Sequence, residues 1–252
     1  GVISLNPDAI NRARQLDEVH QAGDGTPLDS IFGIPVLLKD NIGVEGMATT
    51  AGAVALKENY TDNAFITERL LEKGAIIIGK ANLSEWAYFF CNDCPSGYSA
   101  MGGQTLNPYG RFEFGTGGSS AGSGASTAAN YATVAVGSET SGSILSPASA
   151  NSLVGLKPTT GSLSRTGVVP ISASLDTAGP MTRSIADVVV LFNSMAGYDQ
   201  DDLAMPLISD DMQLIYRETS LAGKRLGVID RYADNAFYNN ALSVLSANNA
   251  EL

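Results

Sequence analysis

Hydrophobic and polar positions follow two different periods along the chain, and the two periods alternate. Apolar side chains three and four residues apart predict a helix that begins after Ser184 and that Gly197 ends. Asn6 and Pro7 are typical of a helix start, and Gly23 is typical of its end, which predicts another helix near the beginning of the chain.

Short apolar runs rich in β-branched residues indicate strands, at 32–40, 75–78, 132–139 and 225–229. A helical pattern over 66–73 precedes the second of these runs, and Gly74 separates the two. Residues 103–130 are rich in Gly, Ser, Thr and Asn, and they predict a loop that runs into a helix of small residues. This alternation predicts an α/β fold with a mixed central β-sheet flanked by helices.

The chain shows no internal repeat and no linker, so we expect one domain over residues 1–252. The sequence begins at Gly1 without a Met and without a signal-peptide pattern. It stops at SANNAEL, which we interpret as the middle of a helix leading to another strand. We therefore expect the fold to be incomplete on its C-terminal side, and the sequence does not indicate a compartment.

The charge balance bears on the partners. The 252 residues carry 15 basic and 26 acidic side chains, a net charge of −11 at neutral pH. Binding to nucleic acid and to anionic membranes depends on Lys and Arg, so neither partner is expected. No apolar run approaches the roughly 18 residues of a membrane-spanning helix. Charged residues make up only 16% of the chain, against about 25% in typical domains, which favours a folded, core-forming protein.

The chain contains two cysteines, Cys91 and Cys94, and one histidine, His20. A closed structural zinc site needs four Cys or His ligands, so the composition excludes one within a single chain. The two cysteines remain open to a disulfide, to redox chemistry or to no role. His20 lies in a polar stretch at the end of the first predicted helix, and we interpret it as a surface residue.

Three polar elements have the composition of a reactive site. Lys39 follows a buried apolar run, and loss of water there would lower its pKa and favour the neutral amine. The run GTGGSSAGSG contains Ser119 and resembles a glycine loop that binds anions, but it lacks the Lys of a P-loop. The turn TSGS places Ser143 after a strand, and the backbone amides of this turn are candidates for an oxyanion hole.

Several longer motifs, taken in order, resemble the amidase signature family and, within it, peptide amidases. They are LKDN, GKANLSEW, GGQTLNP, GGSSAGSG, GSETSGSILSPA, VGLKPTTGSLSRTGVVP and SLDTAGPMTRSIAD. The resemblance covers the chain from about Asn6 to beyond Asp202. Members of this family begin before the position of Gly1 and continue well past Leu252, so the resemblance also implies a chain that is truncated at both ends.

The resemblance implies a Ser–Ser–Lys triad that cleaves a carboxamide to a carboxylate and ammonia. Ser143 would be the nucleophile, Ser119 the bridging serine on a cis peptide bond, and Lys39 the terminal base. Backbone amides would form the oxyanion hole, at Thr140, Ser141, Gly142 and Ser143. The family's reaction needs no metal and no organic cofactor, and the implied partner is a small-molecule or peptide amide. Two further partners stay open: a second copy of this chain in a homodimer, and a missing C-terminal half of the same protein.

The same resemblance assigns supporting roles to other polar residues. Several charged or hydroxyl side chains are expected to hold loops together, namely Asp40, Lys80, Ser84, Glu85, Asp176 and Arg183. The aromatic residues between 86 and 90 are expected to pack or to line the mouth of the pocket.

Three departures from the family pattern affect the choice among functions. Ala121 replaces Gly or Ser, Ser141 replaces Gly or Ala, and Leu145 replaces an arginine that many members use. Leu145 argues against a substrate whose carboxylate that arginine binds, and it favours the C-terminal amides of peptides. Two alternatives stay open: the amidase subunit of an aminoacyl-tRNA amidotransferase, and a catalytically incompetent fragment or binding module.

Overall fold

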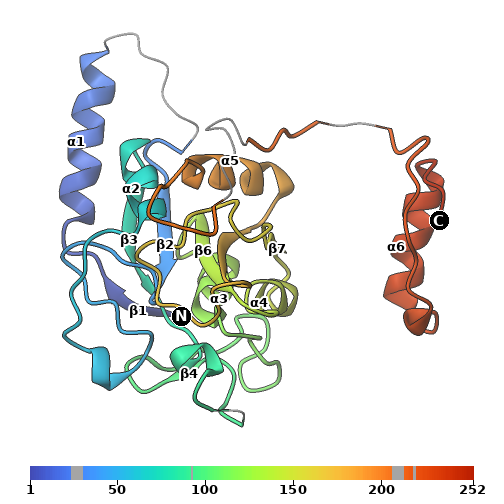
Figure 1. Ribbon diagram of the computed structural model, residues 1–252, viewed down its shortest axis with the longest axis horizontal. Helices are drawn as coiled ribbons and strands as arrows, with labels where there is room; N and C mark the ends of the chain where they lie inside the picture. Colours follow the sequence, from blue (N-terminus) through green and yellow to red (C-terminus); the bar gives the residue numbers. More distant parts are fainter. Residues whose placement is uncertain (24–30, 92, 206–212, 218–219) are drawn as a thin grey trace. The chain divides into compact units, whose positions relative to one another are not determined.

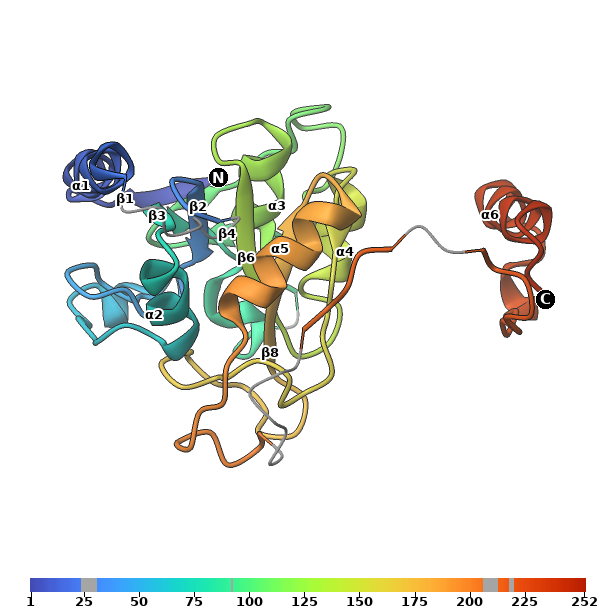
Figure 2. The same ribbon diagram turned by 90° about the horizontal axis from the view of Figure 1, so that it is seen from above.

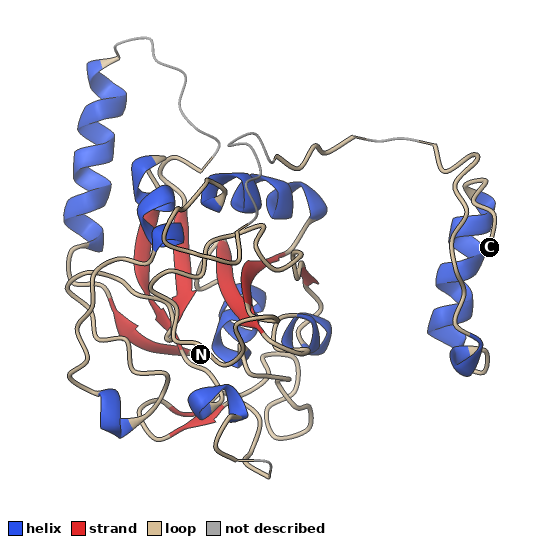
Figure 3. Cartoon of the chain, in the orientation of Figure 1, coloured by secondary structure: helices blue, strands red, loops and turns tan. Residues whose placement is uncertain are grey.

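The computed structural model of the protein describes residues 1–23, 31–91, 93–205, 213–217 and 220–252 (Figures 1 and 3). The chain divides into two compact units, Gly1–Leu214 and Ile215–Leu252. The expected single domain over residues 1–252 stays a prediction. Among the described residues, no helix is both long and apolar enough to cross a membrane.

A six-stranded mixed sheet forms the centre of the first unit. Its strands lie in the order β1 (Val2–Leu5), β3 (Ile76–Ala81), β2 (Pro35–Lys39), β6 (Val134–Glu139), β8 (Thr177–Thr182) and β7 (Val154–Gly155). The central strands β3, β2 and β6 run parallel, whereas β1, β8 and β7 pair with their neighbours in the antiparallel sense. This arrangement confirms the predicted α/β fold with a mixed sheet.

Helices cover both faces of this sheet, as Figure 2 shows. On one face lie α2 (Phe65–Glu72) and α5 (Ile185–Met195), whose apolar side chains share a core with Val36 and Leu38 of β2. On the other face lies α3 (Ala121–Ala128), beside the small cluster around Leu37 and Ala135. Successive side chains of a strand point to opposite faces, so Lys39, two residues after Leu37, points to the α3 face.

The remaining elements of the first unit are short or peripheral. They are α1 (Ala9–Ala22), α4 (Leu145–Ala150), the small hairpin β4 (Tyr98–Ser99) and β5 (Gly103–Gln104), and the 3₁₀ helices η1 (Val54–Leu56) and η2 (Glu85–Tyr88). The α1 helix ends at Gly23 in the left-handed conformation, as predicted. Its N-terminal cap is Asp8, so Pro7 lies before the helix and not at its first position.

Other features of the first unit also differ from the sequence-based expectation. The α5 helix begins after Ser184, whose Oγ accepts a hydrogen bond from the Asp187 amide, but it ends at Met195 and not at Gly197. Strand β8 was not predicted, because its sequence contains Gly179 and Pro180 and no β-branched run. Tertiary packing favours this strand nevertheless: it pairs with β6, and a Cβ atom on Gly179 would collide with the Leu156 carbonyl oxygen.

The second unit contains η3 (Asp230–Tyr232) and α6 (Ala236–Ala247). The Asn235 side chain caps α6 by accepting a hydrogen bond from the Tyr238 amide at 3.0 Å. The predicted strand over 225–229 is wrong: among the described residues only one β-bridge forms there, between Arg225 and Glu251. The chain after α6 turns back to make this bridge, so SANNAEL is the end of a helix and not its middle.

Candidate active site

Of the sequence-predicted residues Lys39, Ser119 and Ser143, the structure brings the side chains of Lys39 and Ser119 into contact. The Ser143 turn lies beside them, joined through a backbone hydrogen bond, at the C-terminal ends of β2 and β6. Lys39 is the last residue of β2, and Ser119 lies two residues before α3, whose N-terminal cap is Ser120. Ser143 lies in the tight turn between β6 and α4, where it is 8% exposed. Parallel strands bring their carboxyl ends to one edge of a sheet, and this edge is where α/β proteins usually bind ligands.

Lys39 is fully buried, with none of its surface exposed. Its Nζ lies 2.7 Å from Ser119 Oγ and donates a hydrogen bond to the Ser138 carbonyl oxygen at 3.1 Å. Burial lowers the pKa of Lys39 to about 7, although the carboxylates of Glu139 and Asp176 act to raise it. A substantial fraction of this amine is therefore neutral near pH 7, and a neutral amine has a lone pair that can accept a proton.

The Ser119 backbone has the cis peptide bond that the family resemblance implies, between Gly118 and Ser119. The Ser119 carbonyl oxygen accepts a hydrogen bond from the Ser84 amide at 3.0 Å. Gly118 packs so tightly that an added Cβ atom would lie 2.6 Å from Ser84 Oγ. The next residue, Ser120, donates its amide proton to the Ser143 carbonyl oxygen at 3.1 Å, which connects the two serine-bearing segments.

Glu139 organises the turn that carries Ser143, and the sequence analysis did not single it out. Its side chain is buried, and its two carboxylate oxygens accept three backbone hydrogen bonds. Oε1 accepts from Gly142 at 2.6 Å, and Oε2 accepts from Ile144 at 2.7 Å and from Leu145 at 3.0 Å. The sequence signal was an acidic residue at the end of a buried strand, directly before a turn of small residues.

These hydrogen bonds affect one of the amides of the predicted oxyanion hole, which stays a prediction. The Gly142 amide already donates to Glu139, so it is not available to a bound oxyanion in this state. The amides of Thr140, Ser141 and Ser143 make no hydrogen bond to another described group of the protein. Gly142 also takes the left-handed conformation in this turn, with a φ of 83°.

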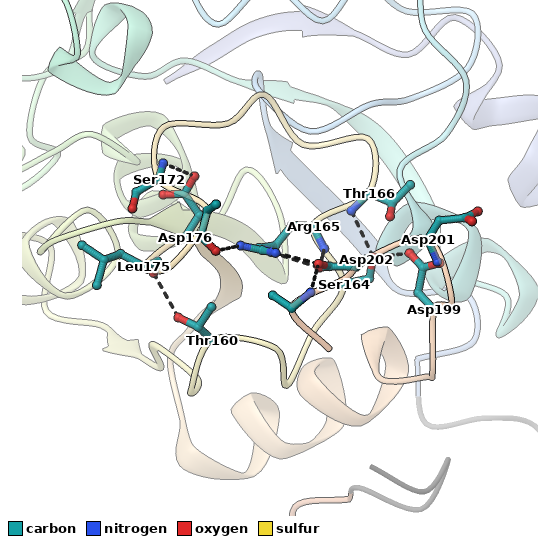
Figure 4. A network of polar contacts seen from close by, with 12 residues as sticks. Thr160, Ser164, Arg165, Thr166, Ser172, Leu175, Asp176, Asp199, Asp201 and Asp202 are labelled. Atoms are coloured by element: carbon teal, nitrogen blue, oxygen red, sulfur yellow. Dashed lines mark hydrogen bonds and ion pairs between the residues drawn. The ribbon is translucent and has the colours of Figure 1, made fainter. Parts of the chain in front are cut away.

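Asp176 connects the Ser143 turn to the loop between β7 and β8. Its Oδ1 accepts a hydrogen bond from Thr140 Oγ1 at 2.5 Å, and its Oδ2 accepts from the amides of Ile171 and Ser172 at 2.7 and 2.8 Å. Figure 4 shows this carboxylate beside Arg165. The predicted structural role of Asp176 thus takes the form of hydrogen bonds to backbone and hydroxyl groups.

Arg165 fixes the other side of that loop (Figure 4). Its Nε and Nη2 donate to the two carboxylate oxygens of Asp202 at 3.0 and 2.6 Å, and its Nη1 donates to the Ala173 carbonyl oxygen. The hydrogen bond from Arg165 lowers the pKa of Asp202 to about 2.

The described residues contain no group of three His, Cys, Asp or Glu side chains that could hold a metal ion.

Asp40 and Lys80 form a buried ion pair one residue away from Lys39. Lys80 Nζ lies 3.7 Å from Asp40 Oδ1 and donates to Thr49 Oγ1 at 3.1 Å. The other carboxylate oxygen of Asp40 accepts hydrogen bonds from the amides of Thr50 and Gly52 at 3.2 and 3.3 Å. Burial lowers the pKa of Lys80 to about 8, against the attraction of Asp40.

The other polar candidates make structural contacts. Ser84 Oγ accepts from the Gly97 amide at 2.9 Å, and Glu85 Oε2 accepts from the Ala100 amide at 2.7 Å. Arg183 donates to backbone carbonyl oxygens on either side of the α3 C-terminus, without an acidic partner among the described residues. His20 is exposed near the end of α1, as expected.

The two cysteines are joined by a disulfide. The Cα atoms of Cys91 and Cys94 lie 5.6 Å apart. Of the alternatives that the sequence left open for these cysteines, the structure shows the disulfide. It follows directly after the aromatic segment of η2 and its neighbours Phe89 and Phe90.

Two cavities lie close to the candidate site, although neither Lys39, Ser119 nor Ser143 lines them. A cavity of about 20 Å³ is lined by Ser138, Glu139 and Thr140, the residues that lead into the Ser143 turn. A larger cavity of about 100 Å³ is lined mainly by apolar residues from η2, from Phe89 and Phe90, and from the loop at 169–171. Asn41, Val169 and Ile171 line both cavities, so the two share part of their walls.

Comparison with known proteins gives relatives that share this site's segments. A probable amidase of Arabidopsis thaliana is 43% identical over 239 residues, which cover 92% of this chain and 46% of that protein. A subunit of the glutamyl-tRNA(Gln) amidotransferase of Symbiobacterium thermophilum is 44% identical over 220 residues, 87% of this chain and 44% of that protein. The chain thus spans about half the length of the curated relatives it matches.

Solved structures give the same result. The native peptide amidase of Stenotrophomonas maltophilia superposes with a TM-score of 0.90 at 44% identity, over 99% of this chain and 53% of that one. The family model for amidases matches residues 1–249, which include all the segments described above. The sequence motifs, the mixed sheet and the matched family model therefore agree that this chain belongs to the amidase family.

Proposed function

We propose that this chain carries the nucleophile and base of an amide hydrolase that converts a carboxamide to a carboxylate and ammonia. The observation that supports this most strongly is the fully buried Lys39 amine, 2.7 Å from Ser119 Oγ and with a pKa lowered to about 7. A buried amine that accepts a proton near neutral pH has the property that a general base needs. Family membership and the similarity to amidases support the same reaction.

In the proposed reaction, protons move along the line Ser143, Ser119, Lys39. The neutral Lys39 amine accepts the Ser119 hydroxyl proton while Ser119 accepts the Ser143 proton, and Ser143 Oγ attacks the amide carbon. The proton returns to the nitrogen of the tetrahedral intermediate, and the C–N bond breaks to release ammonia. Water then hydrolyses the acyl-enzyme by the same relay, which leaves the carboxylate and the free Ser143 hydroxyl.

Backbone amides of the Ser143 turn stabilise the oxyanion of both tetrahedral intermediates. Thr140, Ser141 and Ser143 supply donors that are unused by other described groups. Gly142 contributes only if its amide leaves Glu139, to which it is bound at 2.6 Å. Each donor of this kind contributes about 3–4 kcal/mol to transition-state stabilisation in other serine hydrolases.

We propose the C-terminal amides of peptides as the substrate class. The similarity to a peptide amidase at 44% identity supports this assignment. Leu145 supports it too, because this position at the start of α4 carries no positive charge for a substrate carboxylate.

A second candidate is the amidase subunit of an aminoacyl-tRNA amidotransferase, which acts with partner subunits. The 44% identity to a glutamyl-tRNA(Gln) amidotransferase subunit favours it about as well as the other relatives favour the first candidate. The two differ in their amide donor, so hydrolysis of free glutamine as opposed to a peptide carboxamide separates them. A catalytically incompetent fragment is the third candidate, because this chain spans about half of its relatives.

The test is covalent labelling with a fluorophosphonate probe, followed by intact-mass measurement. We expect one adduct on the wild-type chain, none on Ser143→Ala, and one on the matched control Ser141→Ala, which changes an exposed serine of the same turn. Ammonia release from glutamine, peptide amides and simple amides is measured on the same samples. An adduct that persists in Ser143→Ala contradicts the proposed nucleophile, and no adduct on the wild-type chain favours the incompetent fragment.

A further inference from the structure

Three hydroxyl groups enclose Gly118, the residue before the bridging Ser119. They belong to Ser84, Tyr88 and Ser96, and a Cβ atom added to the glycine would collide with all three of their oxygen atoms. Tyr88 Oη donates a hydrogen bond to Ser96 Oγ at 2.5 Å. The Ser84 amide donates to the Ser119 carbonyl oxygen at 3.0 Å. The peptide unit that carries the bridging serine is therefore held by residues from both sides of the cysteine pair.

The backbone that carries Tyr88 has an unfavourable conformation. Trp86, Ala87 and Tyr88 are consecutive, and all three have a positive φ, of 51°, 52° and 72°. Residues other than glycine usually enter this left-handed region singly, because their Cβ atom is crowded there. A run of three keeps this conformation only where the surrounding structure holds it. At the start of the run, the Trp86 amide donates a hydrogen bond to the Ala51 carbonyl oxygen at 2.9 Å.

The disulfide holds the other end of this left-handed run. The Cys91 amide donates to the Tyr88 carbonyl oxygen at 3.0 Å, and the Cys91 side chain is bonded to Cys94. Cys94 lies two residues before Ser96, whose Oγ accepts the Tyr88 hydroxyl proton. The disulfide therefore closes the turn between two residues whose hydroxyl groups meet beside Gly118. Cys94 is exposed, so a reductant in solution can reach the bond.

From these contacts we infer that Tyr88 is a positioning residue for Ser119. The Cys91–Cys94 disulfide keeps Tyr88 in position, so the redox state of this bond controls the reaction. The inference rests on the proposed function, in which Ser119 relays a proton. A dithiol reductant converts the disulfide to two thiols and is itself oxidised to a disulfide. The left-handed run then relaxes, the Tyr88 hydroxyl moves away from Gly118, and the bridging serine loses its alignment.

The experiment measures the rate of fluorophosphonate labelling of Ser143 before and after reduction with dithiothreitol. We expect reduction to slow labelling by about tenfold or more, because a displacement of about 1 Å near a reacting group costs up to about a hundredfold in rate. Reoxidation should restore the rate. The chain has no cysteines besides these two, so the reductant changes no other bond. A double variant, Cys91→Ser with Cys94→Ser, should be labelled at the slow rate with and without dithiothreitol.

Substitutions at Tyr88 show whether the disulfide acts through this residue. Tyr88→Ala should slow labelling about as much as reduction does, and reduction of this variant should cause no further loss. Tyr88→Phe keeps the ring and loses the hydroxyl, so it should keep more of the rate than Tyr88→Ala. The matched control is Tyr98→Phe, which removes a hydroxyl from a tyrosine of β4 that is 43% exposed. Its labelling rate should equal that of the wild-type chain in each redox state.

A second readout does not depend on labelling. The Ser84 amide donates to the Ser119 carbonyl oxygen, so its hydrogen exchange with solvent reports whether this peptide unit stays in place. We expect reduction to speed the exchange of the Ser84 amide by about tenfold in the wild-type chain, measured by nuclear magnetic resonance. In Tyr88→Ala the exchange should already be fast, and reduction should not change it. Circular dichroism checks that each variant is folded, and Tyr88→Phe replaces Tyr88→Ala if the latter is not.

The outcomes distinguish this inference from the proposed function. Equal labelling rates of the wild-type chain in the two redox states overturn the inference, while the proposed hydrolysis stands. The same holds if reduction slows Tyr88→Ala as much as it slows the wild-type chain, because the disulfide then acts without Tyr88. If Ser143 is not labelled in either state, the proposed hydrolysis falls, and the exchange of the Ser84 amide decides the inference. Faster exchange on reduction supports it, and unchanged exchange overturns it.

Discussion

Lys39 and Lys80 lie in the adjacent strands β2 and β3, and both are fully buried. In the sheet register Lys80 pairs with Leu38, so the two lysines point to opposite faces. Lys80 meets the carboxylate of Asp40, whereas Lys39 contacts only a hydroxyl and a carbonyl oxygen. The two buried lysines thus differ in whether a carboxylate contacts the amine directly, and the proposed role of Lys39 as the base depends on this difference.

The pKa values of the two lysines follow from these partners. Burial lowers the pKa of both, to about 7 for Lys39 and about 8 for Lys80, and Asp40 directly opposes the shift at Lys80. Lys80 in turn stabilises the charged form of Asp40, whose pKa burial raises. The Asp40 carboxylate accepts hydrogen bonds from the turn at 50–52, and the Ala51 carbonyl oxygen of this turn accepts one from the Trp86 amide.

The largest expected difference between the two lysines is in reactivity. Lys39→Met should reduce the rate of fluorophosphonate labelling of Ser143 by about a thousandfold, because the proton acceptor is lost. Lys80→Met is the matched substitution in the next strand, and its labelling rate should stay within about tenfold of wild type. Equal losses in the two variants would show that Lys39 acts only through packing.

The same two variants should differ in stability in the opposite direction. Lys80→Met leaves Asp40 buried without a counter-charge, and we expect the free energy of unfolding to fall by about 3–5 kcal/mol. Lys39→Met should leave it unchanged or raise it at pH 7, because the folded pKa of Lys39 lies below its unfolded value of about 10.4. The unfolded chain binds the extra proton between about pH 7 and pH 10.4, so the cost of burying Lys39 shrinks as the pH rises through this range.

Chemical denaturation of both variants at pH 7 and pH 9 measures these differences. A Lys39→Met protein that is less stable than Lys80→Met would contradict the contrast between an unpaired and a paired lysine.

A smaller effect is expected at Glu139, which contacts the Ser143 turn and not the base. Glu139→Gln keeps the size of the side chain but leaves it one acceptor oxygen in place of two. Three backbone amides bond to the two carboxylate oxygens of Glu139 in the wild-type protein. We expect the plateau labelling rate to fall by about tenfold to a hundredfold. The Glu139 carboxylate also raises the pKa of Lys39, so the midpoint of the pH profile should move to lower pH. A lower plateau of the labelling rate, with the midpoint of its pH profile unchanged, would show that the Glu139 carboxylate does not raise the pKa of Lys39.

The smallest effect is expected at His20, the only histidine of the chain. It is exposed near the end of α1, away from the three candidate residues along the chain and in the fold. His20→Ala should therefore change the labelling rate by less than about twofold at every pH from 5 to 9. A loss of the pH dependence in this variant would assign the titration to His20.

Local sequence patterns predict the parts of the fold that are stabilised locally. The buried runs that become β2, β3 and β6 have continuous β-branched or aliphatic residues, and the helices α1 and α5 have recognisable start signals. Strand β8 and the bridge between Arg225 and Glu251 depend on partners far away in sequence, so no local pattern indicates them.

The candidate site divides in the same way. Lys39, Ser119 and Ser143 stand in motifs that resemble a known family, and burial of the run before Lys39 indicates a lowered pKa. Glu139 accepts hydrogen bonds from backbone amides, and Asn41 donates one to a serine hydroxyl. Such partners are common along any chain, so no sequence pattern indicates which of them these side chains meet. Only the folded geometry shows that Glu139 occupies the Gly142 amide and that Asn41 Oδ1 has no partner among the described residues.

If a neutral Lys39 activates Ser143, the rate at which Ser143 is labelled must follow the loss of the proton from Lys39 as the pH rises. The measurement is the rate of fluorophosphonate labelling from pH 5 to pH 9 on the wild-type chain, with the site of the adduct checked by Ser143→Ala. With the pKa of Lys39 at about 7, the rate should rise about tenfold per pH unit below pH 7 and become constant above it. A rate that is flat over this range, or that is highest in acid, would contradict the account.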